Sequence, residues 1–219
     1  MDLSTGIISF ASSIISAGFG AWLSWYLRGK AFKQEKEKFA KIDMIDPKPN
    51  ELHSRAFYDK QLGLFRSTRQ DVYVSGTGIE QETSEGSQIA KEILGAMERC
   101  MDRGVKITRI QFDCDNKAWI ESVKKLAKKK KKQFSLYLMP PHYQEEQFVQ
   151  LLVTDPSIAS TTCTQILFPE EKHTGVSKQT FAGTAVFIEG NRELSKYVTE
   201  RILKMSKVPG IEKVGASKT

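Results

Sequence analysis

Few residues in this sequence have side chains suited to acid–base or metal chemistry. His142 follows a double proline beside Glu145 and Glu146, and His173 lies five positions before Lys178. Either histidine could contact a phosphate group, although isolated histidines and lysines at a surface are usually only solvated. The three cysteines show no paired spacing and no histidine cluster nearby, which argues against a zinc site or a disulfide framework. We therefore expect no metal and no cofactor.

A glycine-rich turn, Gly76-Thr77-Gly78, follows a short run of residues typical of a β-strand. Backbone amides in such a turn can approach a phosphate, so these three residues are candidates for ligand binding. Gln81 occupies the third glycine position of a dinucleotide fingerprint, and no Lys-Ser or Lys-Thr pair follows the turn. Neither nucleotide-binding pattern is complete, and we interpret the stretch as a tight turn.

A run of lysines carries much of the formal net charge of +7. Positive charge is favourable at the C-terminal end of a helix, which gives these lysines a structural explanation. Their number exceeds what a helix end needs, so a patch that contacts phosphates of nucleic acid or anionic lipid stays open as the alternative. No aromatic residues are interleaved, which argues against stacking on single strands. We call this set the lysine cluster: Lys124, Lys125, Lys128, Lys129, Lys130, Lys131 and Lys132.

The pattern of apolar residues predicts how these candidates are held. Helical and extended segments alternate up to residue 138, three extended segments follow, and a final helix closes the domain. This order predicts an α/β fold with a mixed, mostly parallel sheet flanked by helices. The predicted helices span residues 51–69, 87–103, 119–127 and 192–206, and the predicted strands span 71–75, 105–112, 134–138, 147–154, 157–168 and 179–189, with a loop at 170–177.

An apolar run over residues 6–27 has no charged residue and is long enough to cross a hydrocarbon core of ~30 Å. Trp22, Trp25 and Tyr26 lie at its C-terminal end, and a basic cluster follows it. Because basic residues remain on the cytoplasmic side, we expect a single span with the N-terminus outside and the domain in the cytoplasm, at the inner membrane of a bacterium. The basic cluster follows the run, which argues against a cleaved signal peptide. Small residues at helical spacing within the run suggest self-association.

These observations divide the chain into five parts. Residues 1–5 form a short external tail, 6–27 a transmembrane helix, and 28–49 a basic stalk that continues the helix and ends at Pro47 and Pro49. Residues 50–208 form the cytoplasmic domain, and 209–219 form a flexible tail.

Several strings between residues 51 and 207 resemble one half of the phospholipase D-like superfamily. The strings DVYVSGTGI and MDRGVKITRIQFD resemble its first strand and the end of its helix with the following strand. QFSLYLMP resembles the next strand, and TAVFIEGNRELSKYVTERI resembles the closing strand and helix. The resemblance implies that the turn at Gly76 faces the ligand edge of the sheet.

The chemistry of that family requires a histidine, a lysine two places on, and an aspartate five places further. The histidine attacks phosphorus and the lysine neutralises phosphate oxygens. In the best alignment, Phe148 stands at the histidine position, Gln150 at the lysine position and Asp155 at the aspartate position. A phenyl ring and a neutral amide can do neither task, so the resemblance implies a pseudoenzyme. Two motifs face one another in the family, which implies a homodimer or a higher homo-oligomer here.

Three functions follow as hypotheses. The first is a non-catalytic, membrane-anchored binding or signalling protein that holds a phosphate-containing ligand, nucleic acid or anionic lipid, by analogy with membrane effectors of bacterial antiphage defence. The second is a membrane-bound phosphodiesterase or nuclease that uses a displaced site with His142 or His173. The third is a structural tether that recruits a partner to the bilayer.

Overall fold

The computed structural model describes residues 41–45, 55–79, 84–112, 117–140, 150–167, 170–174, 177–181 and 184–215. The chain divides into two compact units, residues 1–39 and 40–219, and every described residue belongs to the second. The predicted span at 6–27, His142 and Phe148 lie outside the described residues.

One half of the main sheet is parallel and is built as predicted. Strands β2, β3 and β4 pair in parallel, because helices α4 and α5 carry the chain back across the same face of the sheet. Their bounds are β2 Asp71–Gly76, α4 Ser84–Asp102, β3 Lys106–Gln111, α5 Lys117–Lys129 and β4 Phe134–Leu138. This confirms the predicted β-α-β-α-β order.

The other half of the sheet is antiparallel. The described strands follow the order β1-β9-β6-β5-β2-β3-β4-β10, and only the β2–β3 and β3–β4 pairs are parallel. The prediction of a mixed sheet is confirmed, but that of a mostly parallel one is wrong. The connection from β5 to β6 is too short for a crossover, so these strands must be antiparallel neighbours. The bounds are β1 Lys41–Ile45, β5 Gln150–Thr154, β6 Cys163–Leu167, β9 Ala185–Glu189 and β10 Glu212–Lys213.

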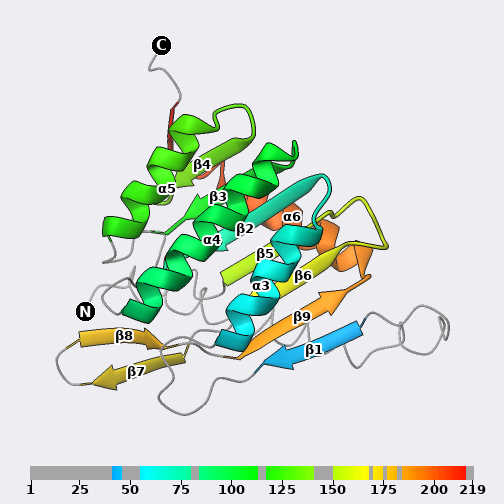
Figure 1. Ribbon diagram of the computed structural model, residues 1–219, viewed down its shortest axis with the longest axis horizontal. Helices are drawn as coiled ribbons and strands as arrows, with labels where there is room; N and C mark the ends of the chain where they lie inside the picture. Colours follow the sequence, from blue (N-terminus) through cyan, green and yellow to red (C-terminus); the bar gives the residue numbers. More distant parts are fainter. Residues whose placement is uncertain are drawn as a thin grey trace, which may run out of the picture. The chain divides into compact units, whose positions relative to one another are not determined.

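Helices cover both faces of the sheet. Helices α3 (Arg55–Ser67), α4 and α5 lie side by side on one face, and α6 (Arg192–Met205) lies on the other (Figure 1). Asn191 caps α6 by accepting a hydrogen bond of 3.0 Å from the amide of Leu194. The sheet is therefore enclosed between two helical layers.

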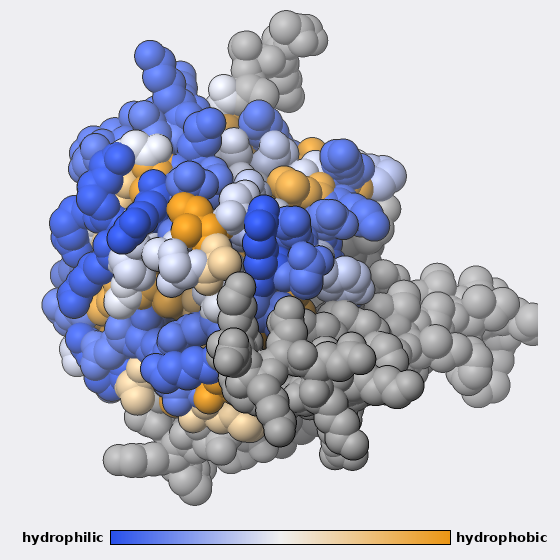
Figure 2. Space-filling view, turned by 90° about the vertical axis from the view of Figure 1, so that its right-hand side faces the viewer, coloured by the Kyte–Doolittle hydropathy of each residue, from blue (hydrophilic) through white to orange (hydrophobic). Residues whose placement is uncertain are grey.

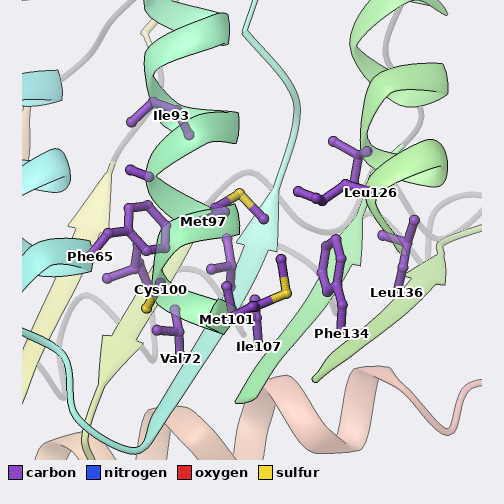
Figure 3. Packing of buried hydrophobic residues seen from close by; sticks show 14 of the residues in the cluster. Phe65, Val72, Ile93, Met97, Cys100, Met101, Ile107, Leu126, Phe134 and Leu136 are labelled. Carbon is purple, nitrogen blue, oxygen red and sulfur yellow. The ribbon is translucent and has the colours of Figure 1, made fainter. Parts of the chain in front are cut away.

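The main core lies between the sheet and its three-helix face. Ile93, Met97, Cys100 and Met101 recur on one side of α4 and pack toward the sheet (Figure 3). Val72 of β2 is fully buried among them. Burial of each such side chain stabilises the fold by about 1.5–3 kcal/mol. On the face shown in Figure 2, the described surface is mostly hydrophilic and its apolar patches are small.

Three boundaries differ from the prediction. Residues 41–45, predicted as part of the helical stalk, form β1 because they pair with β9, and Lys60 of α3 forms ion pairs with Asp43 and Glu189 of these two strands. The predicted loop at 170–177 contains β7 (Glu170–Thr174), which pairs with β8 (Ser177–Phe181) in a separate two-stranded sheet. The predicted tail contains β10, which pairs with β4.

The membrane-anchored chain that we predicted needs a correction. Among the residues that the structure describes, no helix combines the length and apolar character needed to cross a bilayer. The described helices α3 to α6 are amphipathic, because each buries one side while charged residues occupy the other.

Candidate functional site

The best-defined polar site lies where β2 and β3 end and β5 begins. Gly76, the last residue of β2, is opposite Gln111 of β3, and Ser75 is opposite Leu151 of β5. This register places Gln150 beside Gly76. Gln111, Gly76 and Gln150 therefore form one row across three strands.

Thr77 is the centre of a set of buried and half-buried hydrogen bonds at this edge. Its hydroxyl accepts a bond of 2.8 Å from the amide of Gln150, and its carbonyl accepts one of 2.7 Å from the guanidinium of Arg109. The side-chain oxygen of Gln111 accepts bonds from Arg109 at 2.8 Å and from the indole of Trp119 at 3.1 Å. We call Thr77, Arg109, Gln111, Trp119 and Gln150 the polar cluster.

The packing of the polar cluster explains the glycines of the turn. A Cβ atom at Gly78 would lie 2.2 Å from Cδ1 of Trp119, and one at Gly76 would lie 2.9 Å from Oε1 of Gln150. Real Cβ atoms essentially never come so close to other atoms. Both glycines are thus accounted for by the side chains that lie over them, without a bound phosphate. The proposed ligand role of Gly76-Thr77-Gly78 stays a prediction.

Asp155 has a structural role at the other end of β5. It is fully buried with φ 46°, and its carboxylate accepts hydrogen bonds from the backbone amides of Arg69, Gln70 and Asp71 at 3.0, 2.8 and 3.3 Å. These bonds fix the start of β2 to the end of β5. Burial raises the pKa of Asp71, attraction to Lys106 opposes this rise, and the charge of Asp155 adds to it.

The structure does not bring Gln150 and Asp155 together. They lie at opposite ends of β5, about 17 Å apart at ~3.4 Å per residue. Within the polar cluster, Arg109 supplies the positive charge and its guanidinium lies 5.3 Å from the centre of the Trp119 ring. Thr77 has the sole hydroxyl of the cluster, and none of the other four members is a base that could take its proton. The cluster is equipped to hold polar groups in place.

The two candidate histidines have different outcomes. His142 lies outside the described residues. His173 is in β7, and the register of the hairpin sets it opposite Lys178 of β8. The sequence predicted a loop at 170–177 and gave no sign that the two residues pair.

The lysine cluster separates into two groups. Lys124 forms an ion pair with Glu121 at 3.1 Å, and Lys129 forms one with Glu98 at 2.6 Å, which raises the pKa of Lys129. Lys130 forms ion pairs with Asp102 and Glu98, so α5 is tied to α4. The remaining four are exposed and make no ion pair with any acidic residue of the described chain: Lys125, Lys128, Lys131 and Lys132.

Sequence reasoning missed Arg109, Gln111 and Trp119. The signal for the first two was present, because the alternation of a strand puts Arg109 and Gln111 on the same face as the apolar Ile107. Two polar residues on the buried face of a strand indicate a hydrogen-bonded site. Trp119 is the first residue of the helix predicted over 119–127 and gives no such signal.

The sequence matches no protein-family model and no curated protein. Solved structures resemble the fold, among them the phospholipase D family member Nuc from Salmonella typhimurium, with a TM-score of 0.48, 12% identity, and coverage of 75% of this chain and 94% of that one. Phosphatidylserine synthase from Haemophilus influenzae has a TM-score of 0.48 and 8% identity, and the match covers 78% of this chain and 39% of that one. Polyphosphate kinase from Porphyromonas gingivalis has a TM-score of 0.45 and 12% identity, and the match covers 78% of this chain and 27% of that one. These likenesses concern the arrangement of the chain and carry no conclusion about its activity.

Proposed function

We propose that this chain is a non-catalytic protein of phospholipase D-like fold that acts by binding an anionic ligand. The observation that carries the proposal is the position of Gln150, whose amide is hydrogen-bonded to Thr77 and whose side chain lies against Gly76. In the family that the sequence resembles, this position holds the lysine that neutralises phosphate. A neutral amide engaged with its own chain is unable to take over that task.

The charge of the protein supports an anionic ligand. Lys125, Lys128, Lys131 and Lys132 are exposed within and just after α5 and have no acidic partner among the described residues. Four unpaired ammonium groups in so short a segment create a positive potential that attracts polyanions. Lys129 and Lys130 already hold α5 to α4, so these four are not needed for that contact.

The first test is turnover. The purified chain is incubated with bis(p-nitrophenyl) phosphate and with a labelled oligonucleotide. We expect each to be hydrolysed no faster than in buffer without protein. Hydrolysis that Gln150→Ala abolishes would refute a non-catalytic function.

The second test is binding of the same oligonucleotide, used as a polyanion probe, measured by fluorescence anisotropy. Replacing Lys125, Lys128, Lys131 and Lys132 by alanine should weaken binding and reduce its salt dependence. A matched variant loses four exposed basic residues of the opposite, α6 side of the sheet: Arg192, Lys196, Lys204 and Lys207. Equal losses in the two variants would contradict a binding face on α5.

A second candidate function is hydrolysis at a displaced site. The observation that favours it is the pairing of His173 with Lys178 across the β7–β8 hairpin, because a histidine nucleophile and a phosphate-neutralising cation are the groups that phosphodiester cleavage needs. In the turnover assay, hydrolysis by the wild type that His173→Ala abolishes and Gln150→Ala retains would support this candidate instead.

A further inference from the structure

An open groove of about 400 Å³ lies between the outer surfaces of α4 and α5. On α4 it is lined by Lys91, Leu94, Gly95 and Glu98, and on α5 by Ser122, Lys125, Leu126 and Lys129. Each set follows the spacing i, i+3, i+4, i+7, so each helix contributes one continuous stripe over two turns. We call this hollow the α4–α5 groove.

The floor of the groove is apolar and low. Leu94 of α4 and Leu126 of α5 form this floor, together with Gly95 of α4. A glycine inside a helix costs about 0.5–1 kcal/mol relative to alanine. A Cβ atom at Gly95 would meet only the flexible guanidinium of Arg99, at 3.2 Å, so packing within the chain does not require glycine here. The absence of a side chain at Gly95 keeps this part of the floor shallow, with the flexible guanidinium of Arg99 beside it.

The rim of the groove is positive. Lys91, Lys125 and Lys129 border the floor, and Glu98 is the acidic residue among the lining side chains. Glu98 is already matched, because Lys129 lies 2.6 Å and Lys130 3.9 Å from its carboxylate. Lys91 and Lys125 make no ion pair within the described part of the chain, so the net field at the rim is positive.

We propose that the α4–α5 groove binds an acidic amphipathic helix of a partner protein. A recessed apolar floor bordered by cations complements a helix with two apolar anchors about one turn apart and carboxylates beside them. The stripe from Lys91 to Glu98 is about 10.5 Å long at ~1.5 Å per residue, which matches two turns of such a helix.

The same features argue against two other ligands. A nucleic acid strand is held through its phosphates and has no use for an apolar floor. A bilayer surface takes up apolar side chains that protrude, whereas those of the groove are recessed. The inference deepens the proposed function and rests on it, because it names the partner class for the lysine-bearing face.

The test uses two fluorescent, helix-forming peptides of about 15 residues. The acidic peptide carries two leucines one turn apart with glutamates beside them, and the basic peptide carries lysines in place of the glutamates. Measured by anisotropy, the wild-type chain should prefer the acidic peptide by at least about tenfold. The double variant Lys91→Glu, Lys125→Glu should reverse this preference, which a merely destabilised protein would not do.

A second pair of variants tests the floor. Gly95→Leu fills the groove and should weaken binding of the acidic peptide by at least about tenfold. Gly63→Leu is the matched control, because Gly63 lies in α3 with no atom near the position of its missing Cβ. Circular dichroism checks that each variant is folded. If Gly95→Leu does not fold, the double variant Lys91→Glu, Lys125→Glu still tests the inference.

Equal affinity for both peptides, no binding of either, or binding unchanged by the double variant would overturn the inference. Phosphodiester turnover by the wild type would overturn the proposed function whatever the peptides do. Absent turnover together with equal peptide binding would overturn this inference alone.

Discussion

The side-chain amide of Gln150 donates a hydrogen bond of 2.8 Å to the hydroxyl of Thr77 and so joins the first residue of β5 to the turn after β2. Arg109 donates to the carbonyl of the same threonine. The permanent charge of the polar cluster is thus on β3, while the position that the resemblance assigns to a cation is neutral.

Replacing Gln150 measures how far the polar cluster depends on a neutral side chain. Gln150→Met keeps the size of the side chain and removes the bond to Thr77, which should lower the free energy of unfolding by about 0.5–1.5 kcal/mol. Gln150→Lys should cost more, because it brings a second positive charge toward Arg109. Urea unfolding gives both values. A lysine variant as stable as the wild type would show that this site tolerates the family's cation.

Gly78 and Trp119 should be energetically coupled. A Cβ atom at position 78 would lie 2.2 Å from the indole ring, so Gly78→Ala must displace the ring or the turn. We expect a loss of about 1–3 kcal/mol, as for overpacking of a core. In the background of Trp119→Leu, which removes the indole, the same change should cost much less. Urea unfolding of the two single variants and the double variant forms the cycle, and additive losses would contradict the clash.

Asp155 should contribute more to stability than any exposed acidic residue. Asp155→Ala leaves the amides of Arg69, Gln70 and Asp71 without their acceptor and puts alanine at a φ of 46°, so we expect a loss of at least about 3 kcal/mol. Asp155→Asn retains one oxygen acceptor and should cost less. The control is Ser157→Ala at an exposed position, expected within about 0.5 kcal/mol of the wild type in the same unfolding assay. An alanine variant as stable as this control would contradict the structural role.

Local pattern was sufficient to predict the parallel half of the sheet. The apolar stripe of α4, with Ile93, Met97 and Cys100, and the alternation of Phe134 and Leu136 in β4 depend on neighbouring residues in the sequence. The antiparallel half depends on pairing between distant segments. Nothing in the string KIDMI, residues 41–45, indicates that β9 will be its neighbour, so the string was assigned to a helix.

The candidate site was less accessible to sequence reasoning for the same physical reason. Thr77, Arg109 and Gln150 are far apart in the sequence and meet only because β2, β3 and β5 are neighbours. The lysine cluster was found as a run of letters, but its division into paired and unpaired lysines depends on Glu98 and Asp102 of another helix. Composition predicted the charge, and tertiary structure determined which part of it is available.

The two described cysteines should be unreactive in the folded chain. Burial raises the pKa of Cys100 from 9.0 to about 11 and that of Cys163 from 9.0 to about 12, and both side chains are almost fully buried. Because alkylating reagents attack the thiolate, the folded Cys114→Ser variant should not be labelled by iodoacetamide at about pH 8, whereas both thiols should be labelled in urea. Mass spectrometry of peptides locates the label. Rapid labelling of Cys163 in the folded chain would contradict its burial.

The same pKa values fix the sign of a pH dependence. A thiol whose pKa is higher in the folded state favours folding fully below the unfolded value of 9.0, and this contribution is lost as the pH rises toward 11 for Cys100 and 12 for Cys163. The free energy of unfolding should therefore decrease between about pH 9 and pH 11. In Cys163→Ala, which removes one thiol, the decrease over this interval should be less steep, because one fewer group ionises on unfolding. Urea unfolding of both proteins at several pH values measures the two slopes, and equal slopes would show that Cys163 does not contribute.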